Sequence, residues 1–449
     1  MAFFLPFSSH ALTSQTTRNA IQGSAPYLTF DGGRTRVVDA NGLLGITLSD
    51  GMQYTPSTNL SSTTPIVLPV EGQSFADISM FVPTNTNSVD LSSLIGPPYN
   101  YWGDDDGDFG VSATGTLNLS IVDKYSQAVL RSNVPTICKA PYRVTLSSTN
   151  GTLLTRYGFP SRSTFGASSV IYYVNPKASP VVCFARPITS HRYSDQNGPS
   201  WIWNGNNGFL TQSVEPSGYG RNFPTTGLNG LYFDLLISGS NKPLYWSPVS
   251  LGGITVTMTN STATSVRVTL TGPAPTPSQL NSDNPSPIDR PNLPQTFELV
   301  GRDNSGNPIV KYGFTLKQWF VLRPDTLLSS HVNGYYRSST WCRGVTYAMP
   351  RVADLTNSSC PRNYPPCYGA VGATPRSSIN RYKRYIGAGF ITEWGPMRSY
   401  SVGFSNYWIW TRDQKNNSNS YFPVDVISGK VDDQSHIYQY AVLCVLGRR

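Results

Sequence analysis

The chain has 449 residues, too many for one ordinary domain, so two to four domains are expected. Only 13% of the residues are charged and 12% are aromatic, with 39 Gly and 35 Pro, which is typical of short strands joined by turns and argues against long helices. No apolar run approaches the ~20 residues of a membrane helix, so we predict no transmembrane segment.

The net charge of +9 is unevenly distributed along the sequence. Residues 301–449 hold 18 Lys/Arg against 8 Asp/Glu, whereas residues 1–300 hold 16 against 17. Four of the six cysteines and several aromatic clusters also lie in the last third. This distribution indicates a basic binding head presented on a neutral stalk.

The first segment, residues 1–11, is predicted to be a signal-peptide remnant. Its short apolar stretch is followed by small residues that end at Ala11, as in such a segment, but the basic opening region is missing. We therefore expect a misplaced start codon or a fragment. An irregular N-terminus is the alternative.

Residues 12–186 are predicted to form a β region with bacterial Ig-like character. The run from Thr116 to Ile121 alternates apolar and polar residues, which places its apolar side chains on one face of a strand. Asn150 and Gly151 stand between two strand-like runs, and this dipeptide is a strong signal for a hairpin turn.

The rest of the sequence is divided into three predicted segments. Residues 187–272 are expected to be a second β domain, because two alternating runs within them predict a half-buried hairpin over 254–270. Residues 273–295 are rich in proline, which cannot build a β ladder, so we predict an extended linker. Residues 296–449 mix helical and strand patterns and are predicted to be an α+β domain.

An acidic run in the first β region is the candidate metal site. Asp104, Asp106 and Asp108 alternate around a glycine, and hard oxygen ligands of this kind suit calcium. The position that should carry the last ligand of a calcium loop is Gly115, which offers no carboxylate. An acidic surface turn is therefore the alternative, and no cofactor other than calcium is predicted.

The six cysteines predict disulfides in an oxidising compartment. None lies in a Cys-x-x-Cys motif or at zinc-finger spacing from a histidine, which argues against zinc. Buried free thiols are the alternative. Six cysteines allow fifteen pairings. We predict the three that cross no domain boundary: Cys138–Cys183, Cys360–Cys367 and Cys342–Cys444.

A basic segment with interleaved tyrosines is the candidate receptor-binding site. Its members could bind nucleic acid, but a secreted, disulfide-bonded chain rarely meets that partner, so anionic glycans and acidic proteins are better candidates. A solvated loop is the alternative. The candidate residues are Arg376, Arg381, Tyr382, Lys383, Arg384 and Tyr385.

No sequence motif predicts catalysis, so the chain is expected not to be an enzyme. A glycan-active enzyme would need two carboxylates at hydrolase spacing. Glu393 stands alone among aromatic residues and glycines, and we expect it to pair with Arg398.

A family resemblance is carried by several short motifs of the last third. They are Tyr312-Gly313-Phe314, Trp341-Cys342, Gly387-Ala388-Gly389-Phe390, Glu393-Trp394-Gly395 and Cys444-Val445. This part is similar to the adhesion domain, of the invasin E type, of enterobacterial intimin/invasin-like adhesins. Upstream, the segments 25–33, 97–108 and 175–186 resemble the bacterial Ig-like domains of the same proteins.

The resemblance implies a mainly β fold, with Ig-like β-sandwich domains followed by a C-terminal α+β C-type-lectin-like domain. It implies a non-catalytic adhesin tip, secreted or on the bacterial surface (at the outer membrane if part of a larger anchored protein), that binds a host-cell protein or glycan through its C-terminal domain. The alternative is a structural module, or a degraded fragment of a larger protein, without a receptor of its own. No oligomeric state is predicted.

Overall fold

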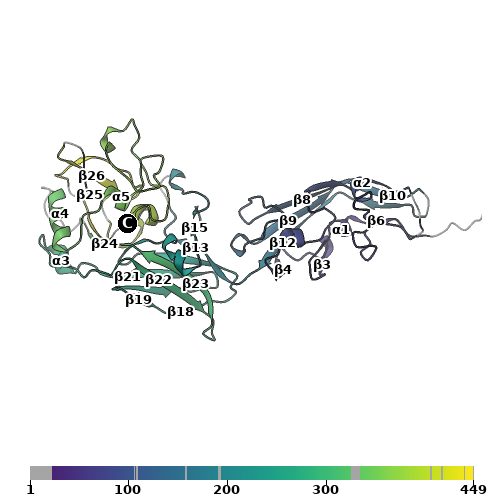
Figure 1. Ribbon diagram of the computed structural model, residues 1–449, viewed down its shortest axis with the longest axis horizontal. Coiled ribbons are helices and arrows are strands. Elements are labelled where there is room, and N and C mark those ends of the chain that lie inside the picture. The colour runs from purple at the N-terminus through teal and green to yellow at the C-terminus, as the bar shows by residue number, and fades with distance from the viewer. Residues whose placement is uncertain are drawn as a thin grey trace, which may run out of the picture. The chain divides into compact units, whose positions relative to one another are not determined.

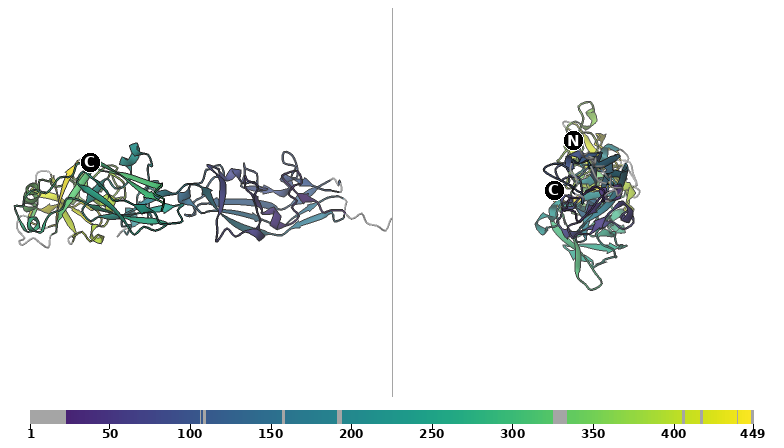
Figure 2. Two further views of the ribbon diagram at one scale, coloured as in Figure 1. Left: turned by 90° about the horizontal axis from the view of Figure 1, so that it is seen from below. Right: turned by 90° about the vertical axis from the view of Figure 1, so that its right-hand side faces the viewer.

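The computed structural model describes residues 23–105, 107, 110–156, 159–190, 194–324, 334–404, 407–415, 418–438 and 440–447. The predicted signal-peptide remnant at residues 1–11 lies outside these ranges. The chain forms two compact units, Met1–Ala178 and Ser179–Arg449 (Figures 1 and 2). None of the helices in the described ranges has the length and apolarity needed to span a bilayer.

In the residues that the structure describes, the first unit is built from short strands in four sheets with little helix. Its largest sheet has the order β4(Ile66–Glu71), β12(Ser168–Lys177), β9(Tyr142–Ser148), β8(Thr116–Val122), β5(Ser88–Asp90). A second sheet has the order β11(Arg162–Phe165), β10(Gly151–Leu154), β7(Ser112–Thr114). The remaining elements are the pairs β1(Tyr27–Leu28) with β6(Trp102–Gly103) and β2(Ile46–Thr47) with β3(Gln53–Tyr54), the helices α1(Ala40–Leu43) and α2(Leu91–Leu94), and the 3-10 turns η1(Pro56–Thr58), η2(Phe75–Asp77) and η3(Ile137–Lys139).

The core of the first unit follows from the alternation seen in its sequence. Leu117, Leu119 and Ile121 on β8 are buried, as predicted, while the residues between them are exposed. They pack in one cluster with Leu153 of β10 and Phe165 of β11, so apolar faces of two sheets meet in the interior. This arrangement agrees with the predicted β-rich, Ig-like character of the region.

The turn at Asn150 and Gly151 differs from the predicted hairpin. β9, which precedes it, pairs with β8 and β12, whereas β10, which follows it, pairs with β7 and β11. The turn therefore carries the chain from one sheet to the other. Gly151 is required there, because a Cβ would overlap the carbonyl oxygen of Thr114.

The second unit is larger, and its described segments form four sheets. The largest has the order β14(Trp203–Asn204), β15(Gly208–Leu210), β13(Val181–Arg186), β17(Tyr232–Ser238), β21(Ser265–Thr271), β20(Ile254–Thr259), β19(Val249–Leu251). The others are β18(Tyr245–Trp246), β22(Gln295–Arg302), β23(Pro308–Leu316); β16(Thr226–Leu228), β24(Gln318–Arg323), β28(Val442–Gly447); and β25(Trp408–Gln414), β26(Ser420–Asp425), β27(Gln434–Ser435). The hairpin predicted over 254–270 is confirmed by the antiparallel pairing of β20 with β21.

Short helices gather toward the C-terminal half of this unit (Figure 1). They are α3(Pro277–Asn281), α4(Gly334–Gly344), α5(Val352–Leu355) and α6(Phe390–Trp394), with the 3-10 turns η4(Ser194–Gln196), η5(Pro216–Arg221), η7(Pro365–Cys367) and η8(Met397–Ser399). The mixed α+β character predicted for residues 296–449 is thus present. Its C-type-lectin-like description stays a prediction.

The Pro-rich segment 273–295 is packed against the second unit, so its prediction as a linker is wrong. The indole N–H of Trp319 donates to the carbonyl of Pro273 (2.9 Å), and that of Trp341 donates to the carbonyl of Gln279 (3.1 Å). The prolines keep the segment out of a ladder, as predicted, but they leave its carbonyls available to distant tryptophans. We call this segment the Pro-rich strap.

The domain boundaries also differ from those predicted at 186/187 and 295/296. β13 pairs with β15 and β17, so the chain enters the second unit before residue 186. One hydrophobic cluster then extends from Val182 to Val445 and includes residues from both sides of the strap. The predicted domains 187–272 and 296–449 therefore share one interior.

Two of the predicted disulfides are present in the second unit. Cys342 on α4 is bonded to Cys444 on β28, and Cys360 is bonded to Cys367. Cys138 and Cys183 are disulfide-bonded as well, and no cysteine of the described chain is free. The pairing of Cys138 with Cys183 stays a prediction.

Candidate functional site

The predicted basic segment forms an extended stretch of the second unit whose side chains alternate between core and surface. Tyr382 and Arg384 are buried, whereas Arg381, Lys383 and Tyr385 are partly exposed. Successive side chains of an extended backbone point to opposite sides, so the three partly exposed residues share one side. Arg376, upstream of this stretch, is exposed.

Arg384 is a structural residue, so its predicted role as a receptor contact is wrong. Its guanidinium donates to the carbonyls of Glu393 and Ile188, both at 2.6 Å, and lies 4.6 Å from the ring centroid of Trp203. Burial lowers the pKa of Arg384 below its usual value. Gly395 leaves the space for it, because a Cβ at that position would overlap the guanidinium.

Tyr382 is likewise unavailable to a receptor. Its ring is completely buried, and its backbone N–H donates to the carbonyl of Ser428 (2.9 Å). Burial raises the pKa of the Tyr382 hydroxyl, which has no hydrogen-bond partner among the described residues. The buried pair of Tyr382 and Arg384 fixes the backbone from which the three outward side chains project.

A tryptophan that sequence reasoning missed lies beside these outward residues. Trp201 is 58% exposed, and its ring meets that of Tyr385 edge-on with centroids 5.7 Å apart. Arg381 forms an ion pair with Asp195 at 2.8 Å. We name Trp201, Arg381, Lys383 and Tyr385 the basic aromatic patch. It is an accessible surface that combines two rings with two cationic side chains.

A second exposed aromatic group lies elsewhere in this unit. Tyr335 is buried and stacks on Tyr421 with centroids 3.5 Å apart. Around this pair, Tyr336, Ile437 and Tyr438 each expose nearly half of their surface. We name these three the tyrosine surface. It is mostly uncharged, which distinguishes it from the basic aromatic patch.

Glu393 is held by neutral donors and not by Arg398, so the predicted ion pair is wrong. Its carboxylate accepts hydrogen bonds from the backbone N–H and hydroxyl groups of Thr225 and Thr226 and from the N–H of Gly387, at 2.6–3.1 Å. Burial raises the pKa of Glu393, although these hydrogen bonds act in the opposite direction. Arg398 instead lies 4.3 Å from the ring centroid of Tyr407.

The acidic turn of the first unit is only partly described. Asp106 and Asp108 lie outside the described residues, so calcium binding stays a prediction. Asp105 forms an ion pair with Arg36 and accepts a hydrogen bond from the Tyr27 hydroxyl at 3.3 Å. Within the described ranges no group of three His, Cys, Asp or Glu side chains could hold a metal ion.

Comparison with known proteins gives matches only among solved structures. No protein-family model matches the chain, and no curated protein matches it. The chain is similar to a C-terminal 282-residue fragment of intimin in complex with the intimin-binding domain of the translocated intimin receptor, with 12% identity over 75% of this chain and 94% of that chain, at a TM-score of 0.32. It is also similar to intimin-190 from enteropathogenic E. coli, with 15% identity over 50% of this chain and 90% of that chain, at a TM-score of 0.26.

These structural neighbours are intimins, of the family that the sequence resembles. TM-scores this low carry no argument about the fold or the partners of this chain. The functional argument therefore rests on the residues of the second unit.

Proposed function

We propose that the chain is a non-catalytic adhesin of the bacterial cell surface that binds an acidic host-cell receptor through the basic aromatic patch. The observation that carries the proposal is the alternation around Arg384, which buries one pair of side chains and thereby fixes Arg381, Lys383 and Tyr385 beside Trp201. Trp, Tyr and Arg are enriched among the few residues that contribute most of the binding energy at protein interfaces.

The charge of the second unit supports an acidic partner. Residues 179–449 hold 24 Lys/Arg against 14 Asp/Glu, while residues 1–178 hold 10 against 11. A unit with this excess attracts acidic surfaces over distances set by the ionic strength. The patch then provides the short-range contacts, with rings that lose little conformational entropy on binding.

The disulfides support an extracytoplasmic location. All described cysteines are bonded, and such bonds persist in secreted and surface proteins. The bond from Cys342 to Cys444 closes a separation of 102 residues and ties α4 to the last strand. A crosslink of this length constrains the unfolded chain strongly, which suits a protein exposed outside the cell.

The competing proposal, a glycan-active enzyme, lacks an accessible acid at Glu393. A glycosidase needs a carboxyl group that reaches the glycosidic oxygen. Glu393 is fully buried, and its oxygens accept hydrogen bonds from five groups of the protein itself. This carboxylate holds β16 against α6, and it offers no surface to a substrate.

The proposal is tested with the labelled full chain on cultured human epithelial cells by flow cytometry. We expect saturable binding that weakens as the salt concentration is raised. The affinity should fall about tenfold or more in Trp201→Ala and in Lys383→Glu, because each variant removes one central contact. Tyr438→Ala is the matched control, because it removes a ring of similar exposure from the tyrosine surface. Circular dichroism establishes that each variant is folded.

The same assay separates the alternatives. Treating the cells with trypsin or with glycosidases shows whether the receptor is a protein or a glycan. Loss of binding in Tyr438→Ala, with Trp201→Ala unaffected, would place the contact on the tyrosine surface and refute the patch. Absence of binding to all cell lines tested would favour a structural module without a receptor.

A further inference from the structure

The first unit contains two neighbouring cavities that share one aromatic wall. The larger, about 500 Å³, and the smaller, about 320 Å³, are both lined by Phe30, Tyr99 and Tyr101. Sites for small ligands commonly span roughly 300–1,000 Å³. Two cavities that share lining residues in this way are suited to successive units of a linear ligand.

The shared wall is fixed by its own packing. The rings of Phe30 and Phe81 meet edge-on with centroids 5.1 Å apart, and those of Tyr99 and Tyr101 are 5.4 Å apart. The backbone N–H of Tyr101 donates to the carbonyl of Leu94 at 2.8 Å. Aromatic faces held in this way stack against the apolar faces of sugar rings without having to order on binding.

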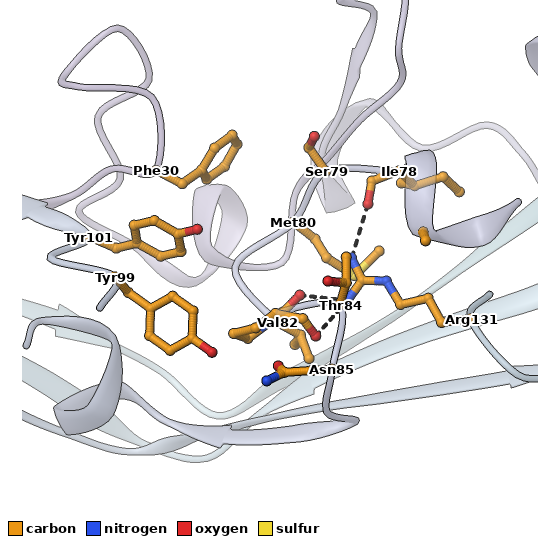
Figure 3. A pocket seen from close by; sticks show the side chains of 12 residues that line it. Phe30, Ile78, Ser79, Met80, Val82, Thr84, Asn85, Tyr99, Tyr101 and Arg131 are labelled. Carbon is orange, nitrogen blue, oxygen red and sulfur yellow. Dashed lines mark hydrogen bonds between the residues drawn. The ribbon is translucent and has the colours of Figure 1, made fainter. Parts of the chain in front are cut away.

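A buried cation lies across the larger cavity from this wall. Figure 3 shows Phe30, Tyr99 and Tyr101 on one side and Arg131 on the other, with its guanidinium group turned toward the cavity. Arg131 is only 7% exposed and donates to the carbonyls of Val82 (2.6 Å), Pro83 (2.9 Å) and Ile78 (3.0 Å). These bonds fix the position of the guanidinium group.

The charge of Arg131 is not neutralised within the described chain. No carboxylate there forms an ion pair with it, and its Nε–H has no hydrogen-bond partner. Burial lowers the pKa of Arg131, as expected for a cation without a counter-ion, although arginine stays protonated at neutral pH. An uncompensated cation at low dielectric favours an anion in the adjoining cavity.

The rest of the larger cavity supplies polar groups. Thr84 and Asn85 line it and are exposed, and their side chains make no hydrogen bond within the described chain. A hydroxyl and an amide offer both donors and acceptors. This combination of a cation, an aromatic wall and neutral polar groups matches the chemistry of an acidic sugar.

The smaller cavity has no such excess charge. It is lined by Thr29, Asn100 and Trp102 in addition to the shared wall. Its nearby carboxylate, that of Asp105, is paired with Arg36. The polar and aromatic lining of this cavity therefore suits a neutral sugar ring.

We propose that the paired cavities of the first unit bind a short linear glycan, with a carboxylate-bearing sugar in the larger cavity beside Arg131 and a neutral sugar in the smaller one. This site lies in a different unit from the basic aromatic patch. It gives the chain a second, carbohydrate-directed binding activity that does not depend on the receptor proposed above.

The site is tested by isothermal titration of the full chain with named probes. The acidic probes are 3′-sialyllactose and trigalacturonic acid, and the neutral ones are lactose and maltotriose. We expect at least one acidic probe to bind about tenfold or more tightly than the neutral probes, and this preference to shrink as salt is raised. Which acidic probe binds tells a sialic acid from a uronic acid.

Variants assign the binding to the cavities. Tyr99→Leu, which removes a stacking ring, is expected to weaken the acidic probe about tenfold, and Asn85→Ala should weaken it less. Tyr173→Leu is the matched control, because Tyr173 is a partly exposed tyrosine of the same unit that lines neither cavity. Arg131→Gln should abolish the preference for acidic over neutral probes. The Arg131→Gln variant disturbs buried hydrogen bonds. If Arg131→Gln fails to fold, the result for Tyr99→Leu decides the outcome.

Any one of three results would overturn the proposal. Equal affinity for acidic and neutral probes would show that Arg131 selects nothing. An acidic probe whose affinity is unchanged in Tyr99→Leu and Asn85→Ala would show that it binds elsewhere. Failure of every probe to bind would show that the cavities are not a glycan site, and it would leave the patch proposal untouched.

Discussion

Two opposite charges are buried in the interior of the second unit without an ion pair between their charged groups. The guanidinium of Arg384 donates to the backbone carbonyl of Glu393, while the carboxylate of Glu393 accepts only from N–H and hydroxyl groups. Burying a charge is costly unless its hydrogen bonds are satisfied. Both residues therefore fix local backbone, and the surface of the basic aromatic patch depends on them.

Replacing Glu393 with glutamine should destabilise the second unit. The amide keeps the shape of the side chain but turns an NH₂ group toward donors that have lost their acceptor. We expect the free energy of unfolding to fall by about 2.5–6 kcal/mol, since hydrogen bonds to charged groups are worth about 1.5–3 kcal/mol and an orphaned donor costs a further 1–3. Urea denaturation measures the change.

A matched control exists at Glu298 on β22. Its side chain is 35% exposed and accepts from the Tyr219 hydroxyl at 2.7 Å. Water can replace that partner, so Glu298→Gln should lose less stability than Glu393→Gln. Equal losses in the two variants would mean that the five donors around Glu393 have no special role.

At the scale of elements, the Pro-rich strap is held to the unit by polar contacts with β24 and α4. Asp283 in the strap pairs with Arg323 on β24 at 3.2 Å and with Arg337 on α4. Figure 1 shows α3 of the strap beside α4, and the hydrogen bond from Trp341 to Gln279 joins the same two helices. The strap is therefore an integral part of the second unit, fixed to β24 and α4.

The strap gives a prediction about acid stability. The hydrogen bond from Arg337, with that from Arg323, holds the pKa of Asp283 below its usual value of 3.8, although burial acts in the opposite direction. The stabilisation is present above pH 3.8 and is lost as the pH falls through the lower pKa of the folded state. Asp283→Asn should lower the melting temperature at pH 6. It should also make the fall in melting temperature between about pH 4 and 2, where Asp283 titrates, less steep. An unchanged pH profile would show that the pair contributes nothing.

An element could be predicted from the sequence where its pattern is local, and could not where its structure depends on contacts with residues far away in the sequence. β8, β20 and β21 were predictable because alternation is local to each strand. The strap was not, since its partners Trp319 and Trp341 lie 46 and 62 residues away from their carbonyl acceptors. The Asn150-Gly151 turn was recognised, but the pairing of its flanking strands depends on segments elsewhere in the chain.

The candidate site was predictable to a similar extent. The cluster of charges and tyrosines at 381–385 is visible in the sequence, but its division into buried and outward residues is not. The partners of this stretch come from a segment far away in the sequence. Arg384 donates to the carbonyl of Ile188, 196 residues away, and Trp201, which contacts Tyr385, comes from the same region of the chain. No local pattern marks either residue.

At the scale of the whole chain, the decisive feature is that each unit has its own core. One cluster contains buried residues between Leu28 and Val174, and the other contains those between Val182 and Val445. The second cluster includes β17 and β21 as well as β22, β23 and β24. The basic C-terminal region is therefore part of a unit that begins at Ser179.

This division predicts how truncations behave. A fragment of residues 179–449, carrying Cys183→Ser because its predicted partner Cys138 is absent, should unfold cooperatively and retain the cell binding of the basic aromatic patch. A fragment of residues 296–449 should fail to fold, because it exposes apolar side chains of β22 and β23 that pack against the strands upstream of the strap, such as Phe314 against Phe233 with ring centroids 6.0 Å apart. It would also lack Trp201.

Thermal unfolding followed by circular dichroism, together with cell binding by flow cytometry, tests both fragments. Stable folding of 296–449 would show that the C-terminal region is a domain of its own and that the shared core is not needed. Folding of 179–449 with loss of cell binding, while the full chain binds, would move the receptor site into the first unit. In that case the paired cavities beside Arg131 become the next surface to examine, and Tyr99→Leu in the full chain distinguishes them from the patch.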